Sequence, residues 1–191
     1  MEADWAAEVG GDAAAIDADW AGFVDLRAKP EAVGEIAETR DFAALREALL
    51  MLNGAASAVF TAKCDVWRLA AEELDPFEYD FGPAEEMEGL ACWVDVVARD
   101  AAMFGSFEMQ RDWARRAVEF LKREPVRSGR VDLVIRAARA GGVDGFGVTL
   151  YAAGCGVDAD AARMALEMVL RAAVNVTMRE ARPPGAGDVG E

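Results

Sequence analysis

The spacing of apolar residues changes at Gly54, and this change constrains the fold more than any other feature of the sequence. Before this glycine, apolar side chains recur at helical spacing. Beyond it they alternate with polar side chains, as expected of strands with one buried face. The alternation is clearest in four stretches: residues 58–67, 91–99, 131–137 and 146–152. These stretches supply four strands of a predicted sheet.

The first 54 residues are predicted to be helical. Asp12, after Gly10–Gly11, is in a position to cap a first helix, and Pro30 suits the first turn of a second. Asp41 is in a position to cap a third helix, which Asn53–Gly54 would end. The apolar stripe of the first helix consists of Ile16, Trp20, Phe23 and Val24.

Two further helices are predicted, one after each pair of strands. Ser106 is a suitable cap for a helix over 107–123, and a second helix begins at Asp158 and runs to about residue 173. Between them, Gly141–Gly142 supplies the chemistry of a hairpin turn. Residues 175–180 are compatible either with an extension of the last helix or with a final strand.

The predicted fold class is α+β: N-terminal helices followed by a four- to five-stranded antiparallel sheet with two helices on one face. The order is ββαββα, or the ferredoxin-like βαββαβ if residues 175–180 form a strand. We divide the chain into an N-terminal helical segment (1–54), a sandwich domain (55–182) and a disordered tail (183–191). The repeated order suggests a possible internal duplication, and the N-terminal helices would cover the second face of the sheet.

Charge limits the partners that the chain can have. It carries 35 acidic and 20 basic side chains, a net charge of −15, so binding to nucleic acid is not expected. Membrane association is not expected either, because no apolar run is long enough to span a bilayer and anionic lipids would repel the chain. We expect a cytoplasmic protein. Exposed strand edges make a homodimer possible.

Several kinds of catalytic site are excluded by residue type. Because the chain has no histidine, it can form neither a Ser-His-Asp triad nor an imidazole-ligated metal site. Its cysteines, Cys64, Cys92 and Cys155, are too widely spaced to signal zinc, and no phosphate-binding loop motif is present. No cofactor is therefore predicted.

Three aspartates provide the strongest candidate for a metal site. The alternation places Asp65, Asp95 and Asp132 on the polar sides of three strands, where carboxylates from neighbouring strands can hold Mg²⁺ or Mn²⁺. The competing interpretation is structural, because basic residues stand two or four residues away on the same polar sides and would form cross-strand ion pairs with the aspartates. Those basic residues are Lys63, Arg99 and Arg136.

The spacing of Glu85, Glu86 and Glu88 ahead of Asp95 resembles that of the all-helical nucleoside triphosphate pyrophosphatases. The resemblance implies acidic residues on two helices. The pattern of residues 91–99 predicts a strand instead, so the predicted fold and that activity exclude one another.

Two binding surfaces are predicted. One is the polar sheet face, where Trp67, Trp93 and Tyr151 would line a pocket beside Lys63, Arg99 and Arg136, or would receive the N-terminal helices. The other is an acidic loop that would dock onto a basic protein through aromatic anchors. Its residues are Phe77, Glu78, Tyr79, Asp80 and Phe81.

From these features we expect a protein-interaction or small-ligand binding module whose partner is another protein or a small molecule. The alternative is a carboxylate-based, Mg- or Mn-dependent enzyme that acts on a phosphorylated or nucleotide substrate.

Overall fold

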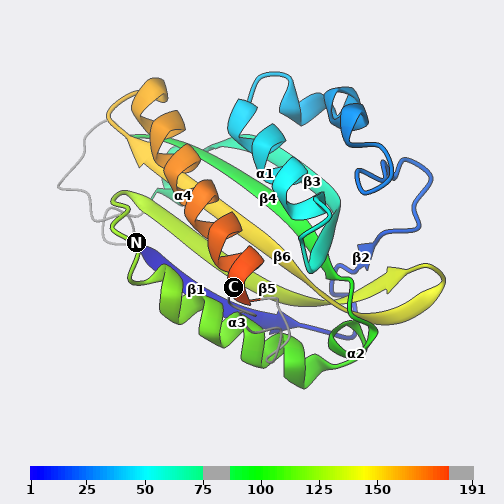
Figure 1. Cartoon of the computed structure of the whole chain (residues 1–191). Coiled ribbons are helices and arrows are strands. Elements are labelled where there is room, and N and C mark those ends of the chain that lie inside the picture. Colours follow the sequence, from blue (N-terminus) through cyan, green and yellow to red (C-terminus); the bar gives the residue numbers. More distant parts are fainter. Residues whose placement is uncertain (75–86, 181–191) are drawn as a thin grey trace, which may run out of the picture.

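The structure, a computed structural model, describes residues 1–74 and 87–180. Six strands form one open sheet in the order β1-β5-β6-β4-β3, and β2 pairs with β5 beyond the end of β1 (Figure 1). Their bounds are β1 Glu2–Glu8, β2 Ile16–Asp17, β3 Val59–Leu69, β4 Glu88–Ala98, β5 Gly129–Ala140 and β6 Val143–Gly156. The four strands predicted from alternation are thus present.

The N-terminus corrects the sequence prediction. The chain begins with a strand rather than a helix, and both β1 and β2 run parallel to β5. The sheet is therefore mixed and not purely antiparallel. The physical reason is that β5 would otherwise be an edge strand with unpaired backbone groups, and β1 satisfies these groups while burying Ala3.

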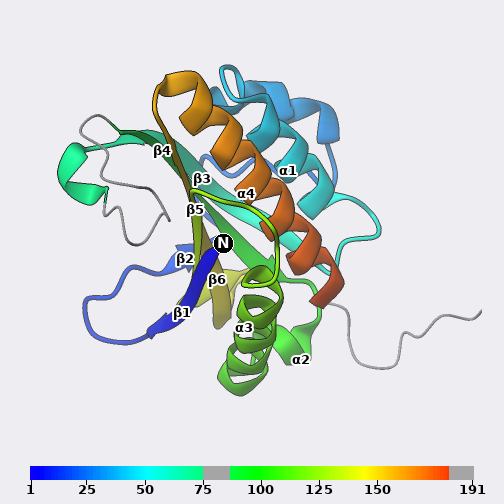
Figure 2. The same ribbon diagram turned by 90° about the vertical axis from the view of Figure 1, so that its left-hand side faces the viewer.

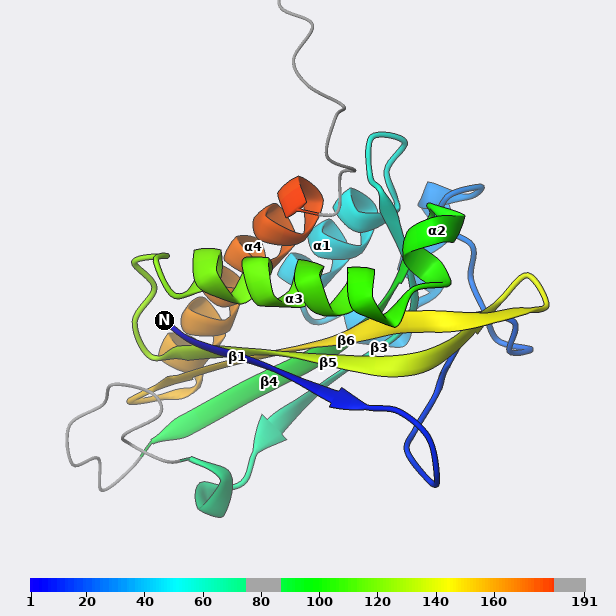
Figure 3. The same cartoon turned by 90° about the horizontal axis from the view of Figure 1, so that it is seen from below.

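Three helices of more than two turns, α1, α3 and α4, cover the same face of the sheet (Figures 2 and 3). The prediction was two helices on this face, with the N-terminal helices on the other. The helical elements are η1 Pro30–Glu35, η2 Ala37–Thr39, α1 Ala43–Asn53, η3 Ala71–Glu73, α2 Ala101–Phe104, α3 Phe107–Leu121 and α4 Ala159–Glu180. Because α4 continues through residues 175–180, the ferredoxin-like order is not formed. After residue 58 the long elements instead follow the order strand, strand, helix twice: β3, β4, α3 and then β5, β6, α4.

Local capping explains where two of these helices begin. The Ser106 hydroxyl accepts a hydrogen bond from the Met109 amide at 3.3 Å, and the Asp158 carboxylate accepts one from the Ala161 amide at 2.8 Å. The prediction for α1 was wrong, because its N-cap is Phe42 and not Asp41. The Asp41 carbonyl instead accepts a 2.7 Å bond from Arg163 of α4.

Glycines fix the turn and the packing of the second hairpin. Gly141 and Gly142 have φ values of 60° and 75°, the left-handed geometry that a two-residue β-hairpin turn requires. At Gly154 a Cβ atom would lie only 2.2 Å from the Leu166 amide nitrogen. Helix α4 can therefore approach β6 so closely only because this position has no side chain.

Residues 18–40 run from the β2 side of the sheet to its opposite edge, at β3. The Asp19 carboxylate accepts hydrogen bonds from the Gly141 and Gly142 amides at 2.7 and 2.8 Å, which ties this segment to the hairpin turn. Further along, the ring of Phe23 packs edge-to-face on that of Phe60 in β3, with 6.5 Å between centroids. One end of the second sheet face is thus covered, but by irregular chain rather than by helices.

Candidate functional site

The side of the sheet away from the helices carries most of the polar residues predicted as a site. Asp65 pairs with Trp93, Trp93 with Tyr151, and Tyr151 with Asp132, so one row crosses β3, β4, β6 and β5. The residues that alternate with this row, such as Cys92, Leu150 and Val131, are almost fully buried beneath the helices. We call the polar side the open face.

Asp95 lies near the centre of the open face and is buried. Its carboxylate accepts a 2.6 Å hydrogen bond from the Thr149 hydroxyl on the neighbouring strand β6. Burial raises the pKa of Asp95, whereas the Thr149 bond and the positive charges of Arg136 and Lys63 oppose that rise. Asp95 is therefore held within a polar network rather than presented to solvent.

The other two predicted metal ligands have separate local partners. Asp132 makes a two-pronged ion pair with Arg130, at 2.7 and 3.0 Å, and the exposed Asp65 accepts a 2.7 Å bond from the Val66 amide. Strand β6 separates Asp132 from Asp95. Within residues 1–74 and 87–180, no three carboxylates or thiols are grouped so that they could hold a metal ion. The structure does not bring the three aspartates together.

Two of the predicted binding-surface cations hold the fold instead. Arg136, almost completely buried, forms an ion pair with Glu8 at 2.9 Å and donates to the Ala14 carbonyl and the Tyr151 hydroxyl, both at 3.3 Å. Arg99 donates to the Val59 and Asn53 carbonyls, each at 2.8 Å, so it caps the end of α1. These contacts occupy both guanidinium groups.

Trp67 and Tyr151 do come together, around a hollow of about 420 Å³ on the open face. Its floor contains Ala91 and Ala153, which are adjacent in the β4–β6 ladder and small enough to leave space. The Arg130–Asp132 pair lies at its far side. The predicted aromatic pocket is thus formed in part, because Trp93 lines a different cavity.

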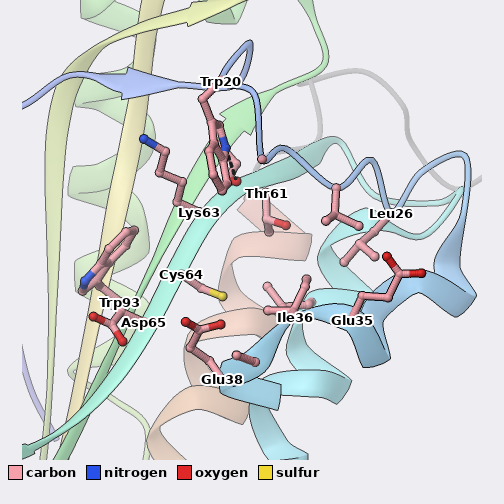
Figure 4. Close-up of a pocket in the computed structure, with 15 residues that line it drawn as sticks. Trp20, Leu26, Glu35, Ile36, Glu38, Thr61, Lys63, Cys64, Asp65 and Trp93 are labelled. Carbon is pink, nitrogen blue, oxygen red and sulfur yellow. Dashed lines mark hydrogen bonds between the residues drawn. The ribbon is translucent and has the colours of Figure 1, made fainter. Parts of the chain in front are cut away.

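That second cavity, of about 540 Å³, follows the free edge of β3 (Figure 4). We call it the edge pocket. Five consecutive strand residues, 61–65, line it together with segments 20–26 and 35–38 of the N-terminal chain. Because strand side chains alternate, the pocket includes both sides of β3. Lys63 and Asp65 lie on the side of Trp93, whereas Cys64 lies on the side of Glu38 (Figure 4).

Trp20 forms one end of the edge pocket. Its indole N–H donates to the Ala62 carbonyl at 3.4 Å, and the Lys63 ammonium lies 5.1 Å from its ring centroid. With 39% of its surface exposed, Trp20 is one of the few large apolar residues that remain accessible in the described part of the chain. The sequence interpretation named Trp20 only as a packing residue.

The charged residues of the edge pocket are mainly acidic. Glu35, Glu38 and Asp65 line it against a single cation, Lys63. Burial raises the pKa of the Cys64 thiol to about 12, and the nearby carboxylates of Glu38, Asp65 and Asp95 add to the effect. Cys64 is therefore a neutral thiol near pH 7 and not an activated nucleophile.

The predicted partner loop, Phe77 to Phe81, lies outside the described residues, as do Glu85 and Glu86. Glu88 and Asp95 lie on strand β4. The all-helical carboxylate arrangement of the pyrophosphatases is therefore not formed here.

Comparisons with protein-family models, with curated proteins and with solved structures found no match to this chain. Within the described part of the chain, no helix has both the length and the apolar character needed to cross a bilayer.

Proposed function

We propose that this protein is an interaction module that binds an extended segment of a partner protein by adding it as a strand to the free edge of β3. The observation that supports this most directly is the position of the edge pocket, which follows five consecutive residues of an edge strand. A pocket of this shape suits a peptide lying alongside the strand better than a compact metabolite.

The backbone of β3 provides the first element of recognition. Its strand neighbour is β4, and among the described residues no strand pairs with its other side. The Val59 carbonyl and the Thr61 amide already bond to Arg99 and Asn53, so an added strand would pair with the part of this edge that lies beyond Thr61. The Trp20 indole contacts the Ala62 carbonyl through a long bond of 3.4 Å, so an incoming strand could replace this contact at modest cost.

Side chains provide the second element. Trp20, Leu26 and Ile36 give the edge pocket an apolar wall that would hold an aliphatic or aromatic anchor of the partner. The carboxylates of Glu35, Glu38 and Asp65 outnumber Lys63, so a partner segment with Lys or Arg beside its anchor is favoured. At low ionic strength the net charge of −15 would also speed the approach of a basic segment.

The test is selection of peptides from a random linear display library on the purified protein, followed by measurement of their affinities by fluorescence anisotropy. The decisive variant is Asp65→Arg. Its matched control is Asp4→Arg on β1, at the opposite edge of the sheet. Both aspartates are exposed, and each accepts a hydrogen bond from the next residue's amide, at 2.7 Å for Asp65 and 2.8 Å for Asp4.

We expect the selected peptides to be rich in β-branched or aromatic residues and to carry Lys or Arg. Asp65→Arg should weaken their binding about tenfold, a loss of about 1.4 kcal/mol, whereas Asp4→Arg should leave it unchanged. Amide hydrogen exchange should slow in β3 when peptide is bound. Equal affinity for the Asp65→Arg variant, or protection that appears in β1 instead of β3, would contradict the proposal.

A further inference from the structure

A second surface, remote from the edge pocket, exposes a cluster of large apolar side chains. Val157, Met164 and Met168 are 70%, 59% and 51% exposed, and all three line one hollow of about 500 Å³. The hollow lies between α4, the end of β6 and the residues that precede β5. Arg127 and Arg171 also line it. We call this surface, defined by these five residues, the α4 groove.

The neighbouring backbone determines the kind of segment that the α4 groove can accept. Strand β5 pairs with β1 and β6, and β6 pairs with β4 and β5, so neither strand has a free edge. A partner cannot add a strand here and must be recognised by side chains. On α4, Met164, Met168 and Arg171 follow the i, i+4, i+7 spacing of one helix face, which suits an antiparallel or crossing partner helix.

The charge of the α4 groove differs from that of the acidic first hundred residues. Among the described residues, the guanidinium groups of Arg127 and Arg171 make no hydrogen bond or ion pair, and Glu167 is the one acidic residue in the lining. Asp158 caps α4 next to Val157. The whole acidic excess lies earlier in the chain: residues 1–100 carry 23 acidic and 7 basic side chains, whereas residues 101–191 carry 12 and 13.

We infer that the α4 groove is a docking site for an amphipathic helix of a partner protein, one that carries acidic residues beside its apolar face. Met164 and Met168 would bury their flexible side chains against that face, because thioether chains adapt to irregular surfaces. Arg127 and Arg171 would pair with the flanking carboxylates. At physiological salt the screening length is about 8 Å, so this local pairing outweighs the repulsion from distant acidic residues.

The experiment is panning of a display library of helical peptides, with randomised faces, on the full chain. Enriched peptides are then titrated against Met164→Ser/Met168→Ser, against Arg127→Glu/Arg171→Glu, and against a matched control, Met109→Ser. Met109 is a methionine of α3 that is 43% exposed and lies outside the α4 groove. All the substituted side chains are exposed, so the variants should fold, as circular dichroism would verify.

We expect the enriched peptides to carry Asp or Glu beside apolar residues at i and i+4. The double serine variant should weaken their binding at least tenfold, the double glutamate variant should favour Lys-substituted peptides, and Met109→Ser should have no effect. Enrichment of basic peptides, or binding that survives in the double serine variant, would overturn the inference.

Sedimentation of the protein without peptide tests the remaining possibility, that a second copy of this chain occupies the α4 groove. A dimer that dissociates in the double serine variant would show that a second copy of this chain occupies the groove, which would also overturn the inference.

Discussion

The buried amide of Asn53 joins helix α1 to strand β3, and its removal should destabilise the protein strongly. Its Nδ2 donates to the Leu49 carbonyl at 2.8 Å and to the Thr61 hydroxyl at 2.7 Å, and its Oδ1 accepts from the Thr61 amide at 3.1 Å. Both Asn53 and Thr61 are buried, at 5% and 7% exposure. The register of β3 shifts just beyond Thr61, so Asn53 satisfies an amide at the margin of the regular ladder.

The magnitude follows from these contacts. Asn53→Ala removes three hydrogen bonds and leaves the Thr61 amide buried without an acceptor. An orphaned buried donor costs about 1–3 kcal/mol and each lost bond about 1 kcal/mol net, so we expect a loss of about 3 kcal/mol, allowing for relaxation. Thr61→Val removes one acceptor and should cost about 1 kcal/mol. The double variant should cost less than the sum, because the two residues share the 2.7 Å bond.

The assay is equilibrium unfolding in guanidinium chloride followed by circular dichroism, with the slope of the transition checked for constancy. The matched control is Asn175→Ala, at an exposed position of α4, which should change the free energy of unfolding by no more than about 0.5 kcal/mol. A loss below about 1 kcal/mol for Asn53→Ala at an unchanged slope would refute this reasoning, as would strict additivity with Thr61→Val.

Two further substitutions test the sheet. Because burial raises the pKa of Asp95 above its unfolded value of 3.8, the folded state holds the proton more tightly; the carboxyl favours folding below pH 3.8, and this contribution is lost as the pH rises through the folded pKa. Asp95→Asn should therefore gain stability relative to the native protein between pH 3 and 7, and a constant difference in urea titrations across that range would contradict this. Gly154→Ala would force α4 away from β6 and should cost about 3 kcal/mol. At the control position, Gly34→Ala, the new methyl group would meet no side chain or backbone from elsewhere in the fold within 4 Å, so an equal melting temperature for both variants would exclude the steric argument.

Elements with strong local signals were predicted well from the sequence. Ser106 and Asp158 cap the helices that follow them, and Gly141–Gly142 forms the expected turn. Residues 2–8 lack such a signal, because alanine and glutamate are good helix formers. They form a strand because β5 offers them a pairing partner more than a hundred residues away. Contacts of this kind cannot be read from local periodicity.

The candidate site shows the same limit. Alternation indicated that Asp65, Asp95 and Asp132 share one face, but their separation depends on the strand order, and β6 lies between β5 and β4. Whether a carboxylate is available also depends on partners such as Thr149 and Arg130. Trp20 was assigned to the apolar stripe of a predicted helix, but residues 18–29 form turns and irregular chain, so helical periodicity could not indicate what Trp20 contacts.

The distribution of charge along the chain connects the two proposed surfaces. The edge pocket is built from residues 20–93, within the acidic part of the sequence, and all but one of its charged lining residues are acidic. The α4 groove is built from residues 127–171, where acidic and basic side chains balance. Because screening limits each surface to its local charges, we expect the two proposed surfaces to select segments of opposite sign. A partner with both a basic extended segment and an acidic helix would bind more tightly than either segment alone, provided that its linker spans the two sites.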